Sequence, residues 1–567
     1  MRTSSLIIIL TSFSGVGWLM PNHYLPWSTA WGDGIAIAIL LLLAAVILWR
    51  APPDIKVSRP LLLVAVISGL VLLFQWLTGR IWFYGDALMS AFYIALWLAA
   101  VGTGALITAS RFSGDILNAL TFGWVIVAIL SVGIALVQWT GALSLGIYMA
   151  DLPPGARPFA NVAQPNHFAT ICLIGLCSLL WLYERREVQR LVFWLAGVFL
   201  LFGMAMSQSR TGWLQVGLVL VAGALARRFY TSRVSLPQLT GLGSIFIGWV
   251  LLWPRLCEML LLTSSRTLTD QMLPGIRLIY WRAMLDAIRQ EPWLGYGWQQ
   301  VGSAQQRIAL NHQPIGDYFE HSHNFILDLL LWNGIPAGLT IAALLTWWLV
   351  SRLRAITDAG SVWLMVLAGG IVIHGLLEYA LEYAYFLIPL GLIMGCLERL
   401  APSKVQVLIP RKFAVFCVGS LAVFFVWTAT EYLDVEEAHR TLRLESARIG
   451  VNAISTPIEP RRLLNQLEAY QRFVSTQATP DMTPAALDAM RMVALRYAYA
   501  PVLFRYALAA GLNAQPRVAR DTLDSICRIH SSARCLEAQA EWLALQLRYP
   551  QLSFIAPPTL LSAKSSN

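Results

Sequence analysis

The chain has 567 residues and a formal net charge of +10, with 57% hydrophobic and 13% charged residues. Its mean hydropathy of +0.61 is far above that of an ordinary soluble domain, so the composition excludes a soluble globular protein and indicates an integral membrane protein. Apolar runs of about 16 to 24 residues recur between polar breaks, which is typical of helical crossings and not of the short alternating segments of a β-barrel.

The apolar runs predict an all-α polytopic membrane protein with about thirteen transmembrane helices. The predicted spans cover residues 5–20, 34–49, 61–77, 87–109, 116–139, 167–183, 191–206, 212–226, 239–253, 325–350, 361–378, 384–398 and 413–430. No small-x-small cleavage pattern follows the first span, so we interpret it as an uncleaved helix and not as a signal peptide.

The distribution of Lys and Arg predicts the orientation, because these residues collect in short cytoplasmic loops. The alternate loops that would lie inside with a cytoplasmic N-terminus hold Arg50, Lys56, Arg59, Arg111, Arg185, Arg186, Arg190, Arg227, Arg228, Arg233, Arg352, Arg354, Arg399, Lys404, Arg411 and Lys412. The net positive charge therefore reports topology, and no basic block with interleaved aromatic residues argues for a nucleic acid partner.

This topology divides the chain into four segments. They are the N-terminal spans (1–253), one large outside loop (254–324), the C-terminal spans (325–430) and a soluble outside tail (431–567). The tail is large enough to bury its own core, and its helical periodicity predicts a small bundle of helix pairs with a binding or scaffolding role. Cys527 and Cys535 lie in this tail and could form a disulfide outside the cytoplasm.

Polar residues gather at two outside helix entries ahead of the large loop. The first entry carries Arg157, Asn161, Gln164, Asn166 and His167. Amide and imidazole groups suit sugar hydroxyls, and helix capping is the alternative. At the second entry, Arg210 stands at the outside end of a span against the charge rule, so it either pairs with an anionic group or extends to lipid headgroups.

The large loop is predicted to hold an amphipathic helix from 275 to 290 that lies along the outer membrane surface. Its apolar face would carry Leu278, Trp281, Leu285 and Ile288, and its polar face Arg282, Asp286 and Arg289. Arg282 and Arg289 bracket Asp286 at helical spacing, which favours a salt-bridged surface. Arg277 begins the helix without such a partner and is the better candidate for binding an anion.

The loop ends in the sequence Glu320-His-Ser-His-Asn324, directly before the span that begins at Phe325. The helix start would place free N–H groups and the positive end of the helix dipole beside His321, His323 and Asn324. Histidine can act as a general base near neutral pH, and an interfacial or capping histidine is the alternative. A metal is disfavoured because no third and fourth ligand accompany the two histidines at recognisable spacing.

Four short motifs together resemble the O-antigen ligase/polymerase superfamily. They are Ser-Arg-Thr-Gly-Trp-Leu at 209–214, Gly-Ile-Arg-Leu-Ile-Tyr-Trp-Arg at 275–282, Pro-Trp-Leu-Gly-Tyr-Gly at 292–297 and His-Ser-His-Asn-Phe-Ile-Leu at 321–327. Within that superfamily, Gln-Pro-Asn-His at 164–167 and the soluble tail resemble the PglL-type bacterial O-oligosaccharyltransferases, which glycosylate pilins and other periplasmic proteins.

The resemblance implies a glycosyltransferase of the bacterial inner membrane whose active site faces the periplasm. Its donor would be a glycan on undecaprenyl diphosphate, transferred as a block to Ser or Thr of a periplasmic acceptor protein, without a metal or other cofactor. The family's two anion-binding arginines fall on Arg210 and Arg277, where they would hold the diphosphate. Its key histidine falls on His323, with His321 as the alternative, and it would orient or deprotonate the attacking hydroxyl.

Two other functions remain open at this stage. An O-antigen ligase or polymerase would use the same chemistry with lipid A-core or another glycan as the acceptor. A transporter or flippase is disfavoured, because the sequence shows no obvious internal repeat and its unusual polar residues gather at one membrane face instead of the midplane.

Overall fold

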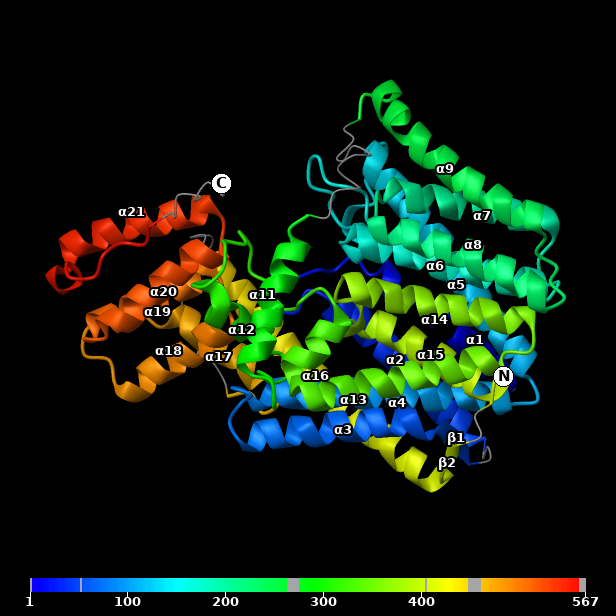
Figure 1. Cartoon of the computed structure of the whole chain (residues 1–567), viewed down its shortest axis with the longest axis horizontal. Coiled ribbons are helices and arrows are strands. Elements are labelled where there is room, and N and C mark those ends of the chain that lie inside the picture. Colours follow the sequence, from blue (N-terminus) through cyan, green and yellow to red (C-terminus); the bar gives the residue numbers. More distant parts are fainter. Residues whose placement is uncertain (1–2, 51–53, 263–274, 403–404, 447–459, 560–567) are drawn as a thin grey trace. The chain divides into compact units, whose positions relative to one another are not determined.

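The computed structural model describes residues 3–50, 54–262, 275–402, 405–446 and 460–559, and this part of the chain is almost entirely helical (Figure 1). The helices before the large loop are α1 (Thr3–Ser12), α2 (Ala30–Trp49), α3 (Arg59–Leu77), α4 (Tyr84–Ala109), α5 (Ser113–Thr140), α6 (Pro165–Glu184), α7 (Arg190–Met206), α8 (Arg210–Phe229) and α9 (Leu236–Met259). The later helices are α11 (Arg277–Gln290), α12 (Val301–Ala309), α13 (Phe325–Ala355), α14 (Ala359–Leu377), α15 (Ala384–Leu400), α16 (Arg411–Ser446), α17 (Asn465–Ser475), α18 (Pro484–Arg496), α19 (Ala500–Leu512), α20 (Pro516–Ile529) and α21 (Ser532–Arg548).

The all-α class is confirmed. Within the described ranges, nine helices are long and apolar enough to cross a membrane, namely α2, α3, α4, α5, α6, α9, α13, α14 and α16. Helix α7 is apolar but has only 17 residues. The count of thirteen crossings and their orientation stay predictions. The one β-ladder among the described residues is the short antiparallel pair of β1 (Ile55–Ser58) and β2 (Gln406–Ile409).

The first predicted span, 5–20, coincides with the apolar segment Ser5–Leu19, but this segment is not one continuous α-helix. Helix α1 ends at Ser12, and a separate 3₁₀ turn follows from Val16 to Leu19. A ten-residue helix rises only about 15 Å, about half of the hydrocarbon thickness. The break has a packing reason: Trp18 is buried and donates its indole N–H to the carbonyl of Tyr385 at 2.8 Å, and a Cβ on Gly17 would meet the carbonyl of Gly32 at 2.6 Å.

The chain forms two compact units. The first unit comprises Met1–Val66, Phe92–Leu273 and Ala343–Ala429, and the second comprises Ile67–Ala91, Pro274–Ala342 and Thr430–Asn567. In the first unit, α6 is the most enclosed candidate span, because 94% of its apolar window is buried and it packs on α5, α7, α8 and α14. Glycines allow these close approaches: a Cβ on Gly370 of α14 would meet the Leu173 side chain of α6 at 2.0 Å.

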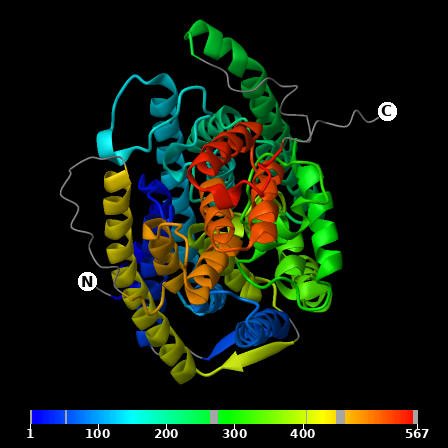
Figure 2. The same cartoon turned by 90° about the vertical axis from the view of Figure 1, so that its left-hand side faces the viewer.

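The second unit combines helices of the large loop and of the tail, which Figure 2 shows in green and in orange to red. Helix α12 packs against α18 and α20 of the tail. Their common core includes Phe83, Ala309, Leu503, Ile526 and Trp542. A disulfide between Cys527 and Cys535, left open by the sequence, joins α20 to the first turn of α21.

Candidate active site

The His-Ser-His-Asn motif forms the cap of α13, which begins at Phe325 as predicted. The side-chain oxygen of Asn324 accepts the N–H groups of Ile326 (3.0 Å) and Leu327 (3.2 Å). The Ser322 hydroxyl donates to the Asn324 carbonyl at 2.9 Å. His323 stands immediately before the cap in the left-handed region, with φ of +57°. This conformation is uncommon for a residue with a side chain and marks a position that the surroundings enforce.

The motif is held from two sides. On one side, the Asp328 carboxylate of α13 accepts the Ser322 N–H at 2.8 Å. On the other, the Trp281 indole of α11 donates to the Ser322 carbonyl at 2.9 Å. Ser322 itself is fully buried. The histidines therefore project from a turn whose backbone is fixed, which is the arrangement that a reacting group requires.

The two histidines have different environments. The His323 ring is partly buried and meets the Phe319 ring edge to face, with 4.8 Å between centroids. His321 is also partly buried, and desolvation, with smaller electrostatic contributions from His323 and Arg496, lowers its pKa to about 3. His321 is therefore neutral at pH 7 and a weak proton acceptor.

Helix α11 brings Arg277 into the same unit as the histidines. Arg277 is its first residue and is partly exposed. Leu278 and Leu285 of the predicted apolar row are 46% and 44% exposed, whereas Ile288 of that row is buried together with Tyr280, Met284, Ala283 and Ala287. The sequence carries two apolar rows on this helix, and the row with the alanines packs on the protein because small side chains allow close approach.

The predicted charge arrangement on α11 is only half correct. Arg289 pairs with Asp286 at 2.5 Å, and His312 Nε2 lies 3.2 Å from the other oxygen of Asp286. Arg282 is exposed and forms no ion pair with a described residue. Arg282 therefore lies on the surface of the unit and does not form the ion pair with Asp286 that the helical spacing predicted.

The glycine motif 292–297 clamps a kink in α13. The Tyr296 N–H donates to the Leu331 carbonyl, and the Ile335 N–H donates to the Pro292 carbonyl, both at 2.7 Å. Positive φ values at Gly295 (+64°) and Gly334 (+75°) let the two backbones touch, because only glycine adopts them without cost. The motif therefore supports the helix that carries the histidine cap, a role that the sequence did not reveal.

The tail contributes a buried ion-pair network next to the motif, which sequence reasoning missed. Arg496 donates to both oxygens of Asp86, at 2.9 and 3.2 Å, and lies 3.9 Å from Glu320. The Tyr499 hydroxyl donates to Glu320 at 2.6 Å, and the Tyr318 hydroxyl donates to the Arg496 carbonyl at 3.0 Å. Arg and Asp are common everywhere in a sequence, so the pairing has no local signature. The network links the tail to the residue directly before His321.

In the first unit, Arg210 opens α8 and is partly exposed. The preceding Ser209 caps the helix by accepting the Gly212 N–H at 3.3 Å. Its hydroxyl donates to Asn166 at 2.6 Å, and the Asn166 amide donates to the Glu378 carboxylate at 2.6 Å. This relay fixes the start of the helix that carries Arg210.

The other polar residues of this unit form its supporting contacts. Arg157 donates to the carbonyls of Ser207 (3.3 Å) and Gln208 (3.2 Å), in the turn before Arg210. Asn161 is 1% exposed, donates to two loop carbonyls and accepts one N–H, so it organises the loop and does not cap a helix. Gln164 stands at the N-cap position of α6, where its side chain makes no capping hydrogen bond.

His167 lies inside the first unit, on α6. It is 1% exposed, and its ring centroid lies 4.7 Å from that of Tyr383 and 5.1 Å from that of His374. Its Nδ1 atom is 3.2 Å from the Tyr385 hydroxyl. The His167 imidazole therefore packs between α6, α14 and the start of α15, in the interior of the first unit. Across the described ranges, no three His, Cys, Asp or Glu side chains meet in an arrangement able to hold a metal ion.

Comparisons with known proteins match three parts of the chain. The family model described as O-Antigen ligase matches residues 195–342, which include Arg210, Arg277 and His323. The model described as Virulence factor membrane-bound polymerase, C-terminal, matches residues 362–543, and the model described as Protein glycosylation ligase matches residues 158–183.

Two curated relatives come from Acinetobacter baylyi. The chain is 29% identical to a "General O-oligosaccharyltransferase" over 553 residues, which is 94% of each chain. It is 28% identical to a "ComP-specific O-oligosaccharyltransferase" over 388 residues, 68% of this chain and 69% of the relative. No solved structure matches the chain.

The fold and the two sets of polar residues define a multi-pass, all-α membrane protein with arginines and a histidine at helix starts. Residues 195–342 are similar to O-antigen ligases, and residues 158–183 are similar to protein glycosylation ligases.

Proposed function

We infer that this chain is a glycosyltransferase, an O-oligosaccharyltransferase that attaches a preassembled glycan to proteins. The observation that carries this conclusion is the similarity over 94% of the chain to a general O-oligosaccharyltransferase. The match at 158–183 to the protein glycosylation ligase model favours a protein acceptor over lipid A-core or another glycan. The donor would be a glycan on undecaprenyl diphosphate, and the acceptor a Ser or Thr of a pilin-like periplasmic protein.

In this reaction, the hydroxyl oxygen of the acceptor attacks the anomeric carbon of the glycan. The bond from that carbon to the diphosphate oxygen breaks, and undecaprenyl diphosphate leaves with the bonding electrons. We assign to His323 the acceptance or orientation of the hydroxyl proton, since it precedes the cap of α13 on a fixed turn. The depressed pKa of His321 makes that histidine the weaker candidate.

Arg210 and Arg277 are assigned to the diphosphate. Each is the first residue of its helix, of α8 and α11 respectively. A guanidinium and the free N–H groups of a helix N-terminus both favour an anion, and both stabilise the charge that develops on the leaving group. Arg282 is exposed on α11 and is expected to contribute little.

The remaining predicted substrate-binding residues are assigned mainly to support. Asn324 caps α13, Asn166 and Arg157 hold the turn before Arg210, and Asn161 and His167 are buried in protein contacts. Gln164 is partly exposed at a helix start and keeps an amide that suits a sugar hydroxyl.

We place the protein in the bacterial inner membrane with a cytoplasmic N-terminus, and residues 254–324 and 431–567 in the periplasm. The disulfide Cys527–Cys535 favours an oxidising compartment for the tail. The exposed Leu278, Ile279 and Leu285 of α11 favour a helix that rests on the membrane surface.

The direct test is co-expression with a lipid-linked glycan pathway and a pilin-like acceptor, followed by intact mass measurement of the acceptor. We expect the acceptor to gain the mass of the whole glycan. Modified lipopolysaccharide with an unmodified acceptor would instead identify a ligase, and no glycan transfer would favour a transporter.

A further inference from the structure

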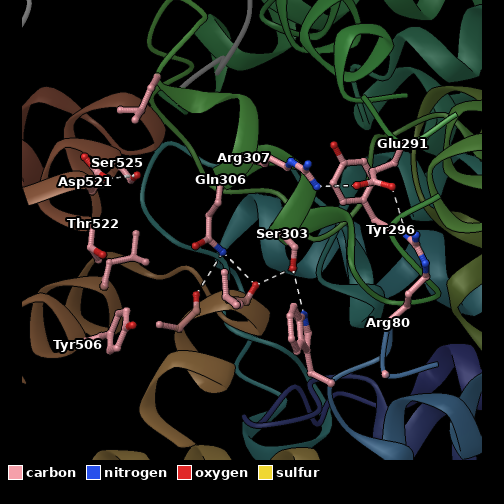
Figure 3. A pocket seen from close by; sticks show the side chains of 16 residues that line it. Arg80, Glu291, Tyr296, Ser303, Gln306, Arg307, Tyr506, Asp521, Thr522 and Ser525 are labelled. Atoms are coloured by element: carbon pink, nitrogen blue, oxygen red, sulfur yellow. Dashed lines mark hydrogen bonds and ion pairs between the residues drawn. The ribbon is translucent and has the colours of Figure 1, made fainter. Parts of the chain in front are cut away.

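The second unit contains a cavity of about 560 Å³, within the range of about 300–1,000 Å³ typical of ligand sites (Figure 3). It is built from residues 79–82, the Glu291–Leu310 region of the large loop, and α18, α19 and α20 of the tail. None of its lining residues belongs to the Arg210, Arg277 and His323 set. It is therefore a separate feature from the candidate active site.

The cavity has two charged walls of different character. Asp521, Thr522 and Ser525 of α20 form one wall, and Figure 3 shows them opposite Arg80, Glu291 and Arg307. On that second wall, the Glu291 carboxylate lies 3.2 Å from Arg80 and 2.7 Å from Arg307. Two arginines share one carboxylate there, so this wall is net positive, whereas Asp521 makes the α20 wall negative.

Tyr506 offers a hydrogen-bonding group to the cavity. Its ring is largely buried, with 7% of the residue exposed, and its hydroxyl points into the cavity (Figure 3). A hydroxyl that faces a cavity can donate one hydrogen bond to a bound molecule and accept others from it.

The side of the cavity formed by the end of α18 leads to the histidine motif. Gln306 donates to the carbonyls of Ala494 (3.2 Å) and Leu495 (2.9 Å), and Ser303 donates to Leu495 at 3.0 Å. The next residue, Arg496, lies 3.9 Å from Glu320, which directly precedes His321. A ligand in the cavity would therefore contact the end of α18, whose last residue, Arg496, interacts with Glu320 beside the histidines.

The lining distinguishes a polypeptide from a sugar. Sugar rings commonly stack on open aromatic faces, but Arg491 covers one face of Trp82 at 5.4 Å. Arg307 lies over Tyr296 at 6.0 Å, and Tyr296 is only 9% exposed. What remains open is apolar surface at Leu310, hydrogen-bonding groups, and charges of opposite sign on facing walls. This combination matches a peptide segment that carries both charged and apolar side chains.

We propose that this cavity docks a short segment of the acceptor protein, with a basic side chain toward Asp521 and an acidic one toward Arg80 and Arg307. The proposal rests on the proposed function, because it names the part of the enzyme that selects the acceptor. It gives the tail a defined role in a reaction whose chemistry lies elsewhere in the chain.

The test compares Thr522→Trp, which fills the cavity from α20, with Asp524→Trp on the same helix outside the lining. Initial rates are measured in detergent with a purified pilin-like protein that the wild type glycosylates and with its lipid-linked glycan donor. We expect Thr522→Trp to raise the KM for the acceptor at least tenfold and to leave the KM for the donor unchanged. Asp524→Trp should leave both unchanged, because its ion pair with Arg520 is partly exposed and weak.

Tyr506→Phe keeps the ring and removes only the hydroxyl, so it separates docking from folding. We expect a rise of about three- to tenfold in the acceptor KM, the value of one hydrogen bond. A photo-crosslinking residue at 522 should capture the pilin-like protein. An unchanged acceptor KM in both cavity variants, or a crosslink to the lipid-linked glycan instead, would overturn the proposal. Failure of the proposed function is distinct, because it shows as a wild type that glycosylates no protein.

Discussion

Arg496 and Asp86 form a buried, two-bonded ion pair, with N–O distances of 2.9 and 3.2 Å and side chains 8% and 4% exposed. Asp86 is in the first turn of α4, and Arg496 ends α18 of the tail. The pair therefore fastens the tail to the segment between two candidate spans, within the second unit. Arg496 also faces Glu320, so the same guanidinium helps to hold the histidine motif.

Arg496→Met should destabilise the second unit strongly. The variant leaves a carboxylate buried without its partner, and breaking such a pair costs about 3–5 kcal/mol. Thermal unfolding in detergent measures the loss. The matched control is Arg534→Met, whose pair with Glu537 is 56% and 52% exposed and should matter by less than about 1 kcal/mol. Equal melting temperatures for the two variants would show that the buried pair does not stabilise the unit.

Gly295→Ala should destabilise the clamp on α13. A Cβ there would approach the Leu331 carbonyl to 2.4 Å and the Gly334 nitrogen to 2.6 Å, and backbone cannot move aside as a side chain can. Gly316→Ala is the control, because Gly316 also has positive φ (+85°) but its Cβ would meet nothing within 4 Å. Both variants pay the cost of positive φ, about 1–2 kcal/mol. Only the Gly295 variant adds a steric clash, so it should have the lower melting temperature. A larger loss in the Gly316 variant would contradict the contact argument.

His321 should make the second unit less stable in mild acid. Burial, with smaller electrostatic contributions from His323 and Arg496, lowers its folded pKa to about 3, whereas the unfolded value is about 6.5. Between these values the unfolded chain binds more protons, so this stabilising contribution is complete above about pH 6.5 and is lost as the pH falls toward 3. We expect the melting temperature of the wild type to fall more steeply from pH 7.5 to 5 than that of His321→Gln. Parallel curves would refute this assignment.

Removal of the Cys527–Cys535 disulfide should cost about 2–3 kcal/mol, as expected for a closed loop of this length. Cys527→Ser and Cys535→Ser should each lower the melting temperature to that of the reduced wild type. Both cysteines are buried, so alkylation is carried out on denatured protein taken from cells. Both cysteines should resist alkylation until a reductant is added, whereas Cys535 should react in Cys527→Ser. Alkylation of both cysteines in the untreated wild type would contradict the periplasmic placement of the tail.

The parts of this fold that the sequence predicts are those set by local patterns. Apolar runs locate the helices, and a cap such as Asn324 before Phe325 gives the start of α13 correctly because capping depends on neighbouring residues. The break after Ser12 was missed, because it depends on a long-range contact. Trp18 donates a hydrogen bond to the Tyr385 carbonyl, more than 360 residues away in the sequence.

In the candidate site, too, local sequence patterns predict some residues, whereas long-range contacts determine others. Arg210, Arg277 and His323 stand out by position at helix starts, and the motif order points to them without any contact information. The clamp by Gly295 and the pairing of Arg496 with Asp86 depend on long-range contacts, so no spacing rule reveals them. The row of α11 that packs on the protein, with Tyr280 and Met284, was not predicted, because only tertiary packing decides which side of the helix is buried.

We propose that His323 acts in the transfer of a glycan to a protein. The most direct measurement is the intact mass of a pilin-like acceptor co-expressed with the glycan pathway and with wild type, His323→Ala or Arg282→Ala, at matched enzyme levels in the membrane. We expect full glycan addition with the wild type, near-normal addition with Arg282→Ala and none with His323→Ala. Full glycosylation by the His323→Ala enzyme would exclude a role for His323 in the transfer.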